Sequence, residues 1–166
     1  MARLGTESAF EVLARAKDHK GASFVEILQN CIVYNDGVFS AFTEKTNSAD
    51  GQVICEHGKP LVFGADRDKG LRLNTDALAI EVVTLGEGGV TEDDLIIHDE
   101  TNRGLATMLA ALKHPGFPVA MGVLFCRPAP AYEVLVHDQI EETTKSSPPT
   151  DLNSLLRRGR TWTVTG

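Results

Sequence analysis

Apolar residues recur at helical spacing in two segments of the chain. Residues 8–20 carry charged side chains between their apolar positions, and residues 104–113 repeat this arrangement. Both patterns predict amphipathic helices, the first ending before Gly21 and the second before Pro115. The candidate N-caps of the two helices are Thr6 or Ser8 and Thr101 or Asn102. A shorter helix is expected over residues 37–43.

Shorter apolar runs predict strands over residues 23–28, 94–98, 119–126 and 132–137. The last of these is expected at the edge of a sheet. Residues 52–55 and 61–63 flank a turn with Gly58 at its tip, so we expect them to pair as a β-hairpin. The first helix leads directly into the strand over residues 23–28, and such an αβ unit favours the α/β fold class.

The C-terminal part of the chain changes in composition. From Asp138 the sequence is acidic and then polar as far as Thr150, which predicts a linker. Residues 151–158 predict a short terminal helix. Trp162 lies near the end of the chain, where a lone tryptophan is expected to dock on a neighbouring surface.

Length and composition limit the classes of protein. The chain has 166 residues, of which 42% are hydrophobic and 23% charged, as in ordinary one-domain globular proteins. A net charge of −7 argues against nucleic-acid binding, which depends on clustered lysine and arginine. The sequence contains neither an apolar run long enough to span a membrane nor a signal peptide at its start, so we expect no membrane association and a cytoplasmic location.

The cysteines are few and widely spaced. Cys31, Cys55 and Cys126 form an odd set that suits no disulfide framework. The chain contains no Cys-x-x-Cys pair, so it cannot supply a four-cysteine metal site by itself. Any cluster bound here would need ligands from elsewhere.

One of these cysteines stands where the first predicted strand ends. Residues 23–28 lead into Cys31, and the turn-forming sequence Asn-Asp-Gly follows at residues 35–37. In α/β folds the carboxyl ends of strands face the ligand crevice, so a thiol here is placed for chemistry. A buried structural thiol is the alternative, because free cysteines are among the most buried residues.

Residues 98–100, His-Asp-Glu, form the acid–base cluster of the sequence. Consecutive residues of a strand point to opposite faces, so these side chains converge only if the chain turns there. Asp50-Gly51 with Asn74 downstream is similar to the Gly-Asp-Gly and Asn motif through which thiamine enzymes hold Mg²⁺. Here Ala49 replaces the first glycine and no helix is expected to follow, so we assign no diphosphate site to these residues.

Several long blocks occur in the order found in one enzyme family. The blocks are KGASFVEILQNCIVYNDG (residues 20–37), EHGKPLVFG (56–64), DRDKGLRL (66–73), FPVAMGVL (117–124), LLR (155–157) and TWTV (161–164). They resemble the β subunit of 2-oxoacid:ferredoxin oxidoreductases, most of all its 2-oxoglutarate branch. The resemblance covers nearly the whole chain but only the C-terminal half of that subunit.

The resemblance implies a fold and a set of domains. Residues 1–45 would form the end of a thiamine-diphosphate-binding domain, which is Rossmann-like with a mainly parallel sheet. Residues 46–137 would form a C-terminal α/β extension with a β-hairpin. Residues 138–166 would form an acidic, proline-containing linker and a terminal helix that docks on a partner.

The resemblance also implies a site. By position, Cys31 matches the family cysteine that completes a [4Fe–4S] cluster whose other ligands lie upstream. Cys31 follows Asn30 here, where other branches have proline. Cys55 and Cys126 match no family ligand and are expected to be core thiols.

The implied activity is the oxidative decarboxylation of a 2-oxoacid to an acyl-coenzyme A, with electrons passing to ferredoxin. The intact enzyme uses thiamine diphosphate with Mg²⁺, a [4Fe–4S] cluster and an α subunit. This chain alone is expected to bind none of these cofactors and to be inactive. Two alternatives remain open: a non-catalytic module that binds an α-type subunit, and an incomplete gene product with an unpaired sheet edge.

Overall fold

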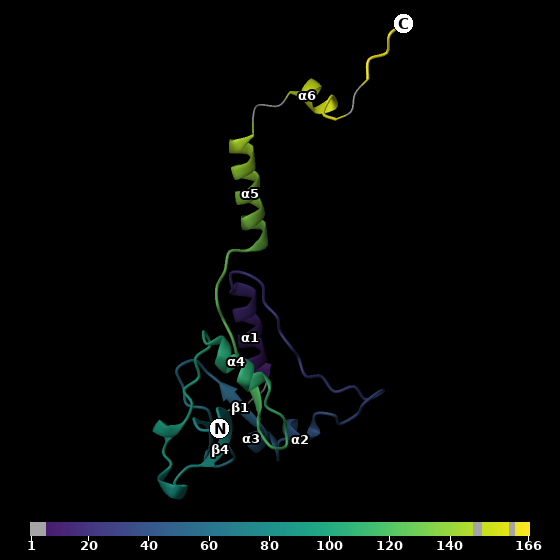
Figure 1. The fold of residues 1–166 in the computed structure, drawn as a ribbon. Helices are drawn as coiled ribbons and strands as arrows, with labels where there is room; N and C mark the ends of the chain where they lie inside the picture. Colours follow the sequence, from purple (N-terminus) through teal and green to yellow (C-terminus); the bar gives the residue numbers. More distant parts are fainter. Residues whose placement is uncertain (1–5, 148–150, 160–161) are drawn as a thin grey trace. The chain divides into compact units, whose positions relative to one another are not determined.

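A computed structural model describes residues 6–147, 151–159 and 162–166, and it has a mixed α/β architecture (Figure 1). Two compact units can be distinguished by their internal contacts. The first unit comprises the described residues up to His19 together with residues 23–128, and it contains both β-sheets. The second unit comprises residues 20–22 and the described residues from Ala129 onward. The predicted α/β class is therefore confirmed as a mixture of helices and sheets, whereas the described residues form no mainly parallel sheet.

A two-stranded parallel sheet lies in the first unit. Strand β1 (Gln52–Cys55) pairs with β5 (Val119–Gly122), with Val53 opposite Ala120. Helix α1 (Thr6–Asp18) contacts β5, and α4 (Arg103–Ala110) begins at the N-cap Asn102, whose side chain accepts a hydrogen bond from the backbone N–H of Leu105. Both long predicted helices of this unit are thus confirmed, and Asn102 is the N-cap of the second.

A three-stranded antiparallel sheet is the second sheet of the first unit. Strands β2 (Val62–Phe63), β3 (Lys69–Asn74) and β4 (Ala79–Thr84) pair in the order of the sequence. The predicted hairpin between residues 52–55 and 61–63 is wrong, although both strands and the turn at Gly58 form. The reason is that each strand pairs with a different neighbour: β1 pairs with β5, and β2 pairs with β3.

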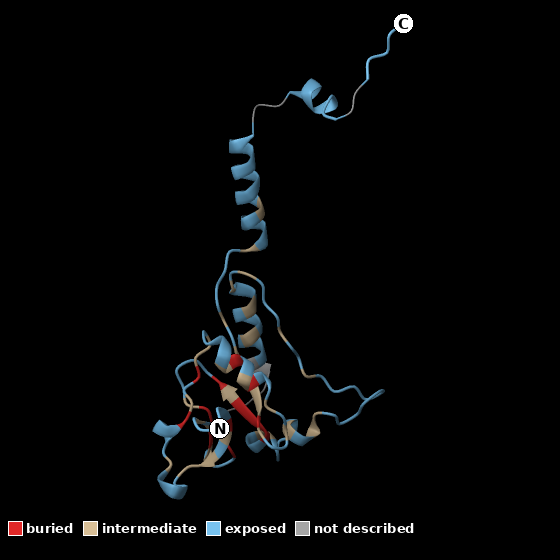
Figure 2. Ribbon diagram, in the orientation of Figure 1, coloured by how far each residue is buried: buried red, intermediate tan, exposed pale blue. Residues whose placement is uncertain are grey.

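The core of the first unit lies where these elements meet. Buried residues concentrate on β1, β2, β3 and α4 (Figure 2). Its members are Val53, Cys55, Leu61, Phe63, Leu71, Ile80 and Leu109. Burial of this apolar surface supplies the main stabilisation of the unit.

The predicted strand over residues 23–28 does not form. These residues carry no regular secondary structure, and Phe24 and Ile27 are 91% and 70% exposed. A strand requires hydrogen bonds to a neighbouring strand, and none pairs with this segment among the described residues. Residues 23–28 together with Cys31 and the loop up to Gly37 are called the exposed segment below.

The shorter elements of the first unit differ in part from expectation. Helix α2 (Ser40–Thr43) confirms the short helix, although it starts later than predicted, and α3 (Ser48–Gly51) was not expected. Two 3-10 helices follow β4, η1 (Glu87–Gly89) and η2 (Glu92–Asp94). The strand predicted over residues 94–98 is wrong: η2 occupies its start, and only Ile97 makes an isolated bridge, with Pro60.

In the second unit a helix replaces a predicted strand and linker. Helix α5 spans Tyr132–Ser146, where an edge strand and then an unstructured segment were expected. The apolar residues Tyr132, Val136 and Ile140 recur every four positions, so the pattern fits a helix better than the alternation of a strand. Residues 148–150 of the predicted linker and Thr161 of the C-terminal block lie outside the described residues.

The predicted terminal helix is confirmed as α6 (Leu152–Leu156), whose N-cap Asp151 accepts a hydrogen bond from the N–H of Ser154. Trp162 is 85% exposed and is not docked within the described part of the chain. Among the described residues, no helix combines the length and the apolar composition that crossing a bilayer would require.

Candidate functional site

The loop that carries Cys31 is closed by side-chain hydrogen bonds. The amide nitrogen Nδ2 of Asn30 donates to Oδ1 of Asp36 at 2.8 Å, and the N–H of Gly37 donates to Oδ1 of Asn30 at 2.9 Å. Gly37 has φ of 72°, the left-handed conformation that glycine adopts without strain. The N–H of Asn35 also donates to the carbonyl of Cys31 at 3.0 Å. The loop therefore has a defined shape although it lies on the surface.

This shape surrounds the thiol of Cys31 with backbone donors. The side chain of Cys31 is exposed, and the N–H of Tyr34, followed by those of Val33 and Asn35, lowers the pKa of its thiol. Hydrogen bonds from backbone N–H groups favour the thiolate over the thiol. The thiolate is the form that binds metal ions and iron–sulfur clusters.

Within the described part of the chain, Cys31 does not belong to a group of side chains that could hold a metal ion by itself. The described residues contain no group of three or more His, Cys, Asp or Glu side chains placed to hold a metal ion. Cys55 is buried in the core, where burial raises the pKa of its thiol to about 12. Cys31 is thus the exposed thiol and Cys55 the buried one.

The acid–base cluster predicted at residues 98–100 does not converge. His98 is fully buried, and its Nε2 lies 2.8 Å from the carbonyl oxygen of Val123, whereas its Nδ1 has no hydrogen-bond partner among the described residues. The hydroxyl of Thr101 is the main cause that lowers the pKa of the Asp99 carboxyl, and Arg15 does the same for Glu100. Each of these side chains thus has a separate structural contact.

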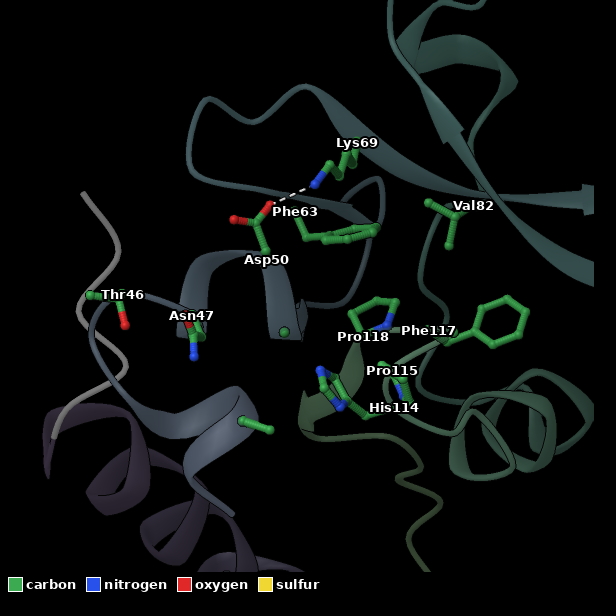
Figure 3. Close-up of a pocket in the computed structure, with 13 residues that line it drawn as sticks. Thr46, Asn47, Asp50, Phe63, Lys69, Val82, His114, Pro115, Phe117 and Pro118 are labelled. Atoms are coloured by element: carbon green, nitrogen blue, oxygen red, sulfur yellow. Dashed lines mark hydrogen bonds and ion pairs between the residues drawn. The ribbon is translucent and has the colours of Figure 1, made fainter. Parts of the chain in front are cut away.

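A pocket of about 400 Å³ opens beside α3 in the first unit (Figure 3). Its polar side chains include Asn47, His114 and the ion pair between Asp50 and Lys69, whose nitrogen and oxygen are 2.7 Å apart. Phe63 and Phe117 supply apolar surface. Asn74 is not among the lining residues, so the pocket does not bring Asp50 and Asn74 together as a magnesium–diphosphate site would require.

Cys31 follows from the sequence pattern, but the hydrogen bonds that shape its loop were not predicted. The polar residues on either side of the cysteine, Asn30 and Asp36, were a signal that could have predicted side-chain hydrogen bonds across the loop. The backbone N–H groups of residues 33–35 left no such signal, since any residue type supplies them. Their orientation depends on the closed loop.

The chain is related in sequence to a subunit of an oxidoreductase. The relative is the 2-oxoglutarate oxidoreductase subunit KorB of Mycobacterium tuberculosis, to which the chain is 31% identical over 159 residues. The matched region covers 93% of this chain and 41% of the relative. No protein-family model matches the chain, and no solved structure matches it. The resemblance predicted from the sequence blocks is confirmed by this relationship.

Proposed function

We propose that this chain forms the C-terminal portion of the β subunit of a 2-oxoacid:ferredoxin oxidoreductase, with 2-oxoglutarate as the 2-oxoacid. Cys31 would be one of the ligands of a [4Fe–4S] cluster in that enzyme. The observation that carries the proposal is the exposed thiol of Cys31 in a closed loop, with backbone N–H groups that favour its thiolate. The relationship to KorB supports the assignment of the enzyme class.

The donor set of this loop fits a cluster ligand. Iron–sulfur clusters are held by cysteine thiolates, and hydrogen bonds to the sulfur atoms tune their reduction potential. In the loop, the N–H groups of Val33, Tyr34 and Asn35 would donate to the ligating sulfur, while Asn30 and Asp36 hold the backbone in this conformation. A bound cluster accepts and passes on single electrons, which is the chemistry that reduction of ferredoxin requires.

The remaining ligands and the thiamine diphosphate site would come from polypeptide outside this sequence. The chain spans 41% of the length of its relative, and its described residues form no group of three metal-ligating side chains. An α subunit would complete the sites for 2-oxoacid and coenzyme A. By itself, therefore, the chain is expected to bind neither thiamine diphosphate nor an intact cluster.

The exposed segment supports an assembly of this kind. Phe24 and Tyr34 are both 91% exposed, and large apolar side chains on both sides of Cys31 lack cover. Exposed apolar surface of this extent marks a contact with another polypeptide. We propose that residues 1–45 complete a thiamine-diphosphate-binding domain in the assembled subunit, and that residues 46–137 form its extension. Residues 138–166, with α5 and α6, would dock on the partner subunit.

Metal analysis of the assembled complex tests the role of Cys31. The chain would carry an affinity tag and be purified without oxygen together with the polypeptides that bind it. We expect iron and acid-labile sulfide in a ratio of about 1:1, and a 2-oxoglutarate- and coenzyme A-dependent reduction of a one-electron dye. Cys31→Ser should lose most of this iron and sulfide, because serine supplies no thiolate.

Cys55→Ala serves as the matched control, since Cys55 is buried and its thiol has no place in the proposed site. This variant should keep its iron if it remains folded by circular dichroism. Unchanged iron content in Cys31→Ser would contradict the ligand role. Stoichiometric binding of thiamine diphosphate by the isolated chain would contradict the proposed division of sites between polypeptides.

A further inference from the structure

Two segments of the first unit meet at a second cysteine. Cys126 follows β5 and is half-buried, and its Sγ lies 3.7 Å from Nδ1 of His19, which follows the end of α1. The backbone N–H of Cys126 donates to the carbonyl of Glu100 at 2.7 Å. The thiol is therefore held beside an imidazole that comes from a part of the chain 107 positions away.

A guanidinium completes this cluster. Arg15 of α1 donates two hydrogen bonds to the carboxylate of Glu100, at 2.7 and 3.0 Å. Glu100 is the main cause that raises the pKa of Arg15, and the Cys126 thiol is a lesser cause. Glu100 therefore links the guanidinium to the segment of the thiol, because its carboxylate binds Arg15 and its carbonyl accepts the N–H of Cys126. The cluster of Cys126, His19 and Arg15 is called the α1 thiol cluster.

This arrangement has the parts that activate a sulfur nucleophile. An imidazole within hydrogen-bonding distance can accept the thiol proton, and a neighbouring guanidinium stabilises the thiolate that results. The other cysteines lack this combination among the described residues. Cys55 is buried, with the pKa of its thiol raised to about 12 by burial, and Cys31 is surrounded by backbone N–H groups.

We propose that Cys126 is a site of thiol–disulfide exchange with anionic low-molecular-weight disulfides, with His19 as the base and Arg15 as the attracting cation. The guanidinium of Arg15 selects the charge of the disulfide, because opposite charge raises the local concentration of the reagent at the thiol. This role is separate from the cluster ligand role of Cys31 and does not require other subunits.

The exchange step is balanced without any further reagent. The Cys126 proton moves to Nδ1 of His19, and the thiolate sulfur attacks one sulfur of the disulfide. The sulfur–sulfur bond of the reagent breaks as the bond to Sγ forms, and the second sulfur leaves as a thiolate that takes up the proton. Cys126 is oxidised to a mixed disulfide, and the leaving half of the reagent is reduced.

Two disulfides of opposite charge test the selection in the unaltered chain. Oxidised glutathione is anionic and cystamine is cationic, and peptide mass spectrometry measures the rate of modification at each cysteine. We expect the ratio of the glutathione rate to the cystamine rate to be about tenfold higher at Cys126 than at Cys31. Molar concentrations of salt should reduce this difference, because they screen the cations. Equal ratios at the two cysteines would overturn the proposal.

His19→Gln tests the base, with Lys17→Gln as its matched control. Both substitutions remove a basic residue from the same region, but only His19 has a ring nitrogen beside Sγ. The rate at Cys126 should fall about tenfold in His19→Gln and change less than about twofold in Lys17→Gln. Equal rates in the two variants would overturn the role of His19. If a variant folds poorly, the comparison of the two disulfides still tests the proposal, because it uses the unaltered chain.

Discussion

Residues 52–55 and 23–28 are both short runs of apolar side chains that follow a polar segment, but only the first forms a strand. β1 pairs in parallel with β5, and Val53 is fully buried. Residues 23–28 find no neighbouring strand among the described residues, and Phe24 is 91% exposed. An apolar run identifies side chains that are stabilised by burial. Whether the run forms a strand depends on a neighbouring strand with which its backbone can pair.

This difference distinguishes the packed core from the exposed segment. The sheets and α4 enclose the buried core of the first unit. The exposed segment carries Cys31 and a locally closed loop but leaves its apolar side chains uncovered. A ligand loop next to an uncovered apolar segment is suited to a site shared between polypeptides, as proposed above. Four substitutions test this difference between the core and the exposed segment.

Leu71→Ala should have the largest effect, since Leu71 is fully buried in the core. We expect the free energy of unfolding to fall by about 3 kcal/mol, because the substitution removes buried methyl groups and leaves a cavity. Ile27→Ala, in the exposed segment, should change it by less than about 0.5 kcal/mol. Urea denaturation of the isolated chain measures both values. Similar losses in the two variants would mean that the exposed segment is packed in solution.

Gly122→Ala should destabilise the parallel sheet by about 2 kcal/mol. Gly122 has φ of 107°, and an added Cβ would lie 2.9 Å from the carbonyl oxygen of Cys55 on the paired strand. Gly86→Ala is the control, since Gly86 also has a positive φ but an added Cβ would meet nothing within 4 Å. Thermal unfolding of both variants distinguishes two effects: backbone strain, which both substitutions cause, and the close contact with the paired strand, which only Gly122→Ala causes. Equal losses would contradict the pairing of β1 with β5.

Glu100→Gln should lower the stability at neutral pH by about 0.5 kcal/mol, a small value because Arg15 is half exposed and its ion pair is screened. Arg15 holds the pKa of the Glu100 carboxyl below its ordinary value, so the folded state keeps this group ionised at lower pH than the unfolded state does. The stabilisation is therefore present above the unfolded pKa and is lost as the pH falls through the folded pKa.

The difference in the free energy of unfolding between Glu100→Gln and the unaltered chain should therefore disappear at low pH. Urea denaturation across a pH series measures this difference. Glu26→Gln is the control, because it removes a carboxyl from the exposed segment, and at neutral pH it should lower the stability less than Glu100→Gln does. A difference for Glu100→Gln that persists unchanged at low pH would show that the ion pair with Arg15 is not its cause.

Asn30→Ala should have the smallest effect on stability, within about 0.5 kcal/mol of the unaltered chain. Its effect should appear instead at the thiol of Cys31, because Asn30 holds the loop that aims backbone N–H groups at the sulfur. We expect the pKa of this thiol to rise, measured as a shift in the pH dependence of its alkylation. Gln29→Ala is the control, and equal profiles for the two variants would contradict the role of the loop.

The helices were the most predictable part of the fold. α1 and α4 follow from their apolar spacing, and the cap at Asn102 follows from its amide side chain. The strand partners were not predictable, because β1 and β5 lie far apart in the sequence and their register depends on the surrounding core. The first residues of α5 by themselves fit an edge strand, whereas the repeat of four that continues to Ile140 fits a helix.

The candidate site, like the fold, could be predicted only in part from the sequence. Cys31 could be selected from its position between an apolar run and an Asn-Asp-Gly turn, and from the blocks shared with an enzyme family. The donors to its sulfur could not, because they are backbone groups whose direction is decided by the closed loop. The contact between Cys126 and His19 left no trace in the sequence, since 107 positions separate them.

The sequence by itself determined the α/β class, the long N-terminal helix, the relationship to an oxidoreductase subunit and the cysteine of interest. These depend on local spacing and residue identity, which are read along the chain. Only the tertiary structure decided which apolar runs pair, that residues 23–28 stay exposed, and which thiol lies beside a base. Those outcomes depend on contacts between distant residues, and a contact exists only once the intervening chain has packed.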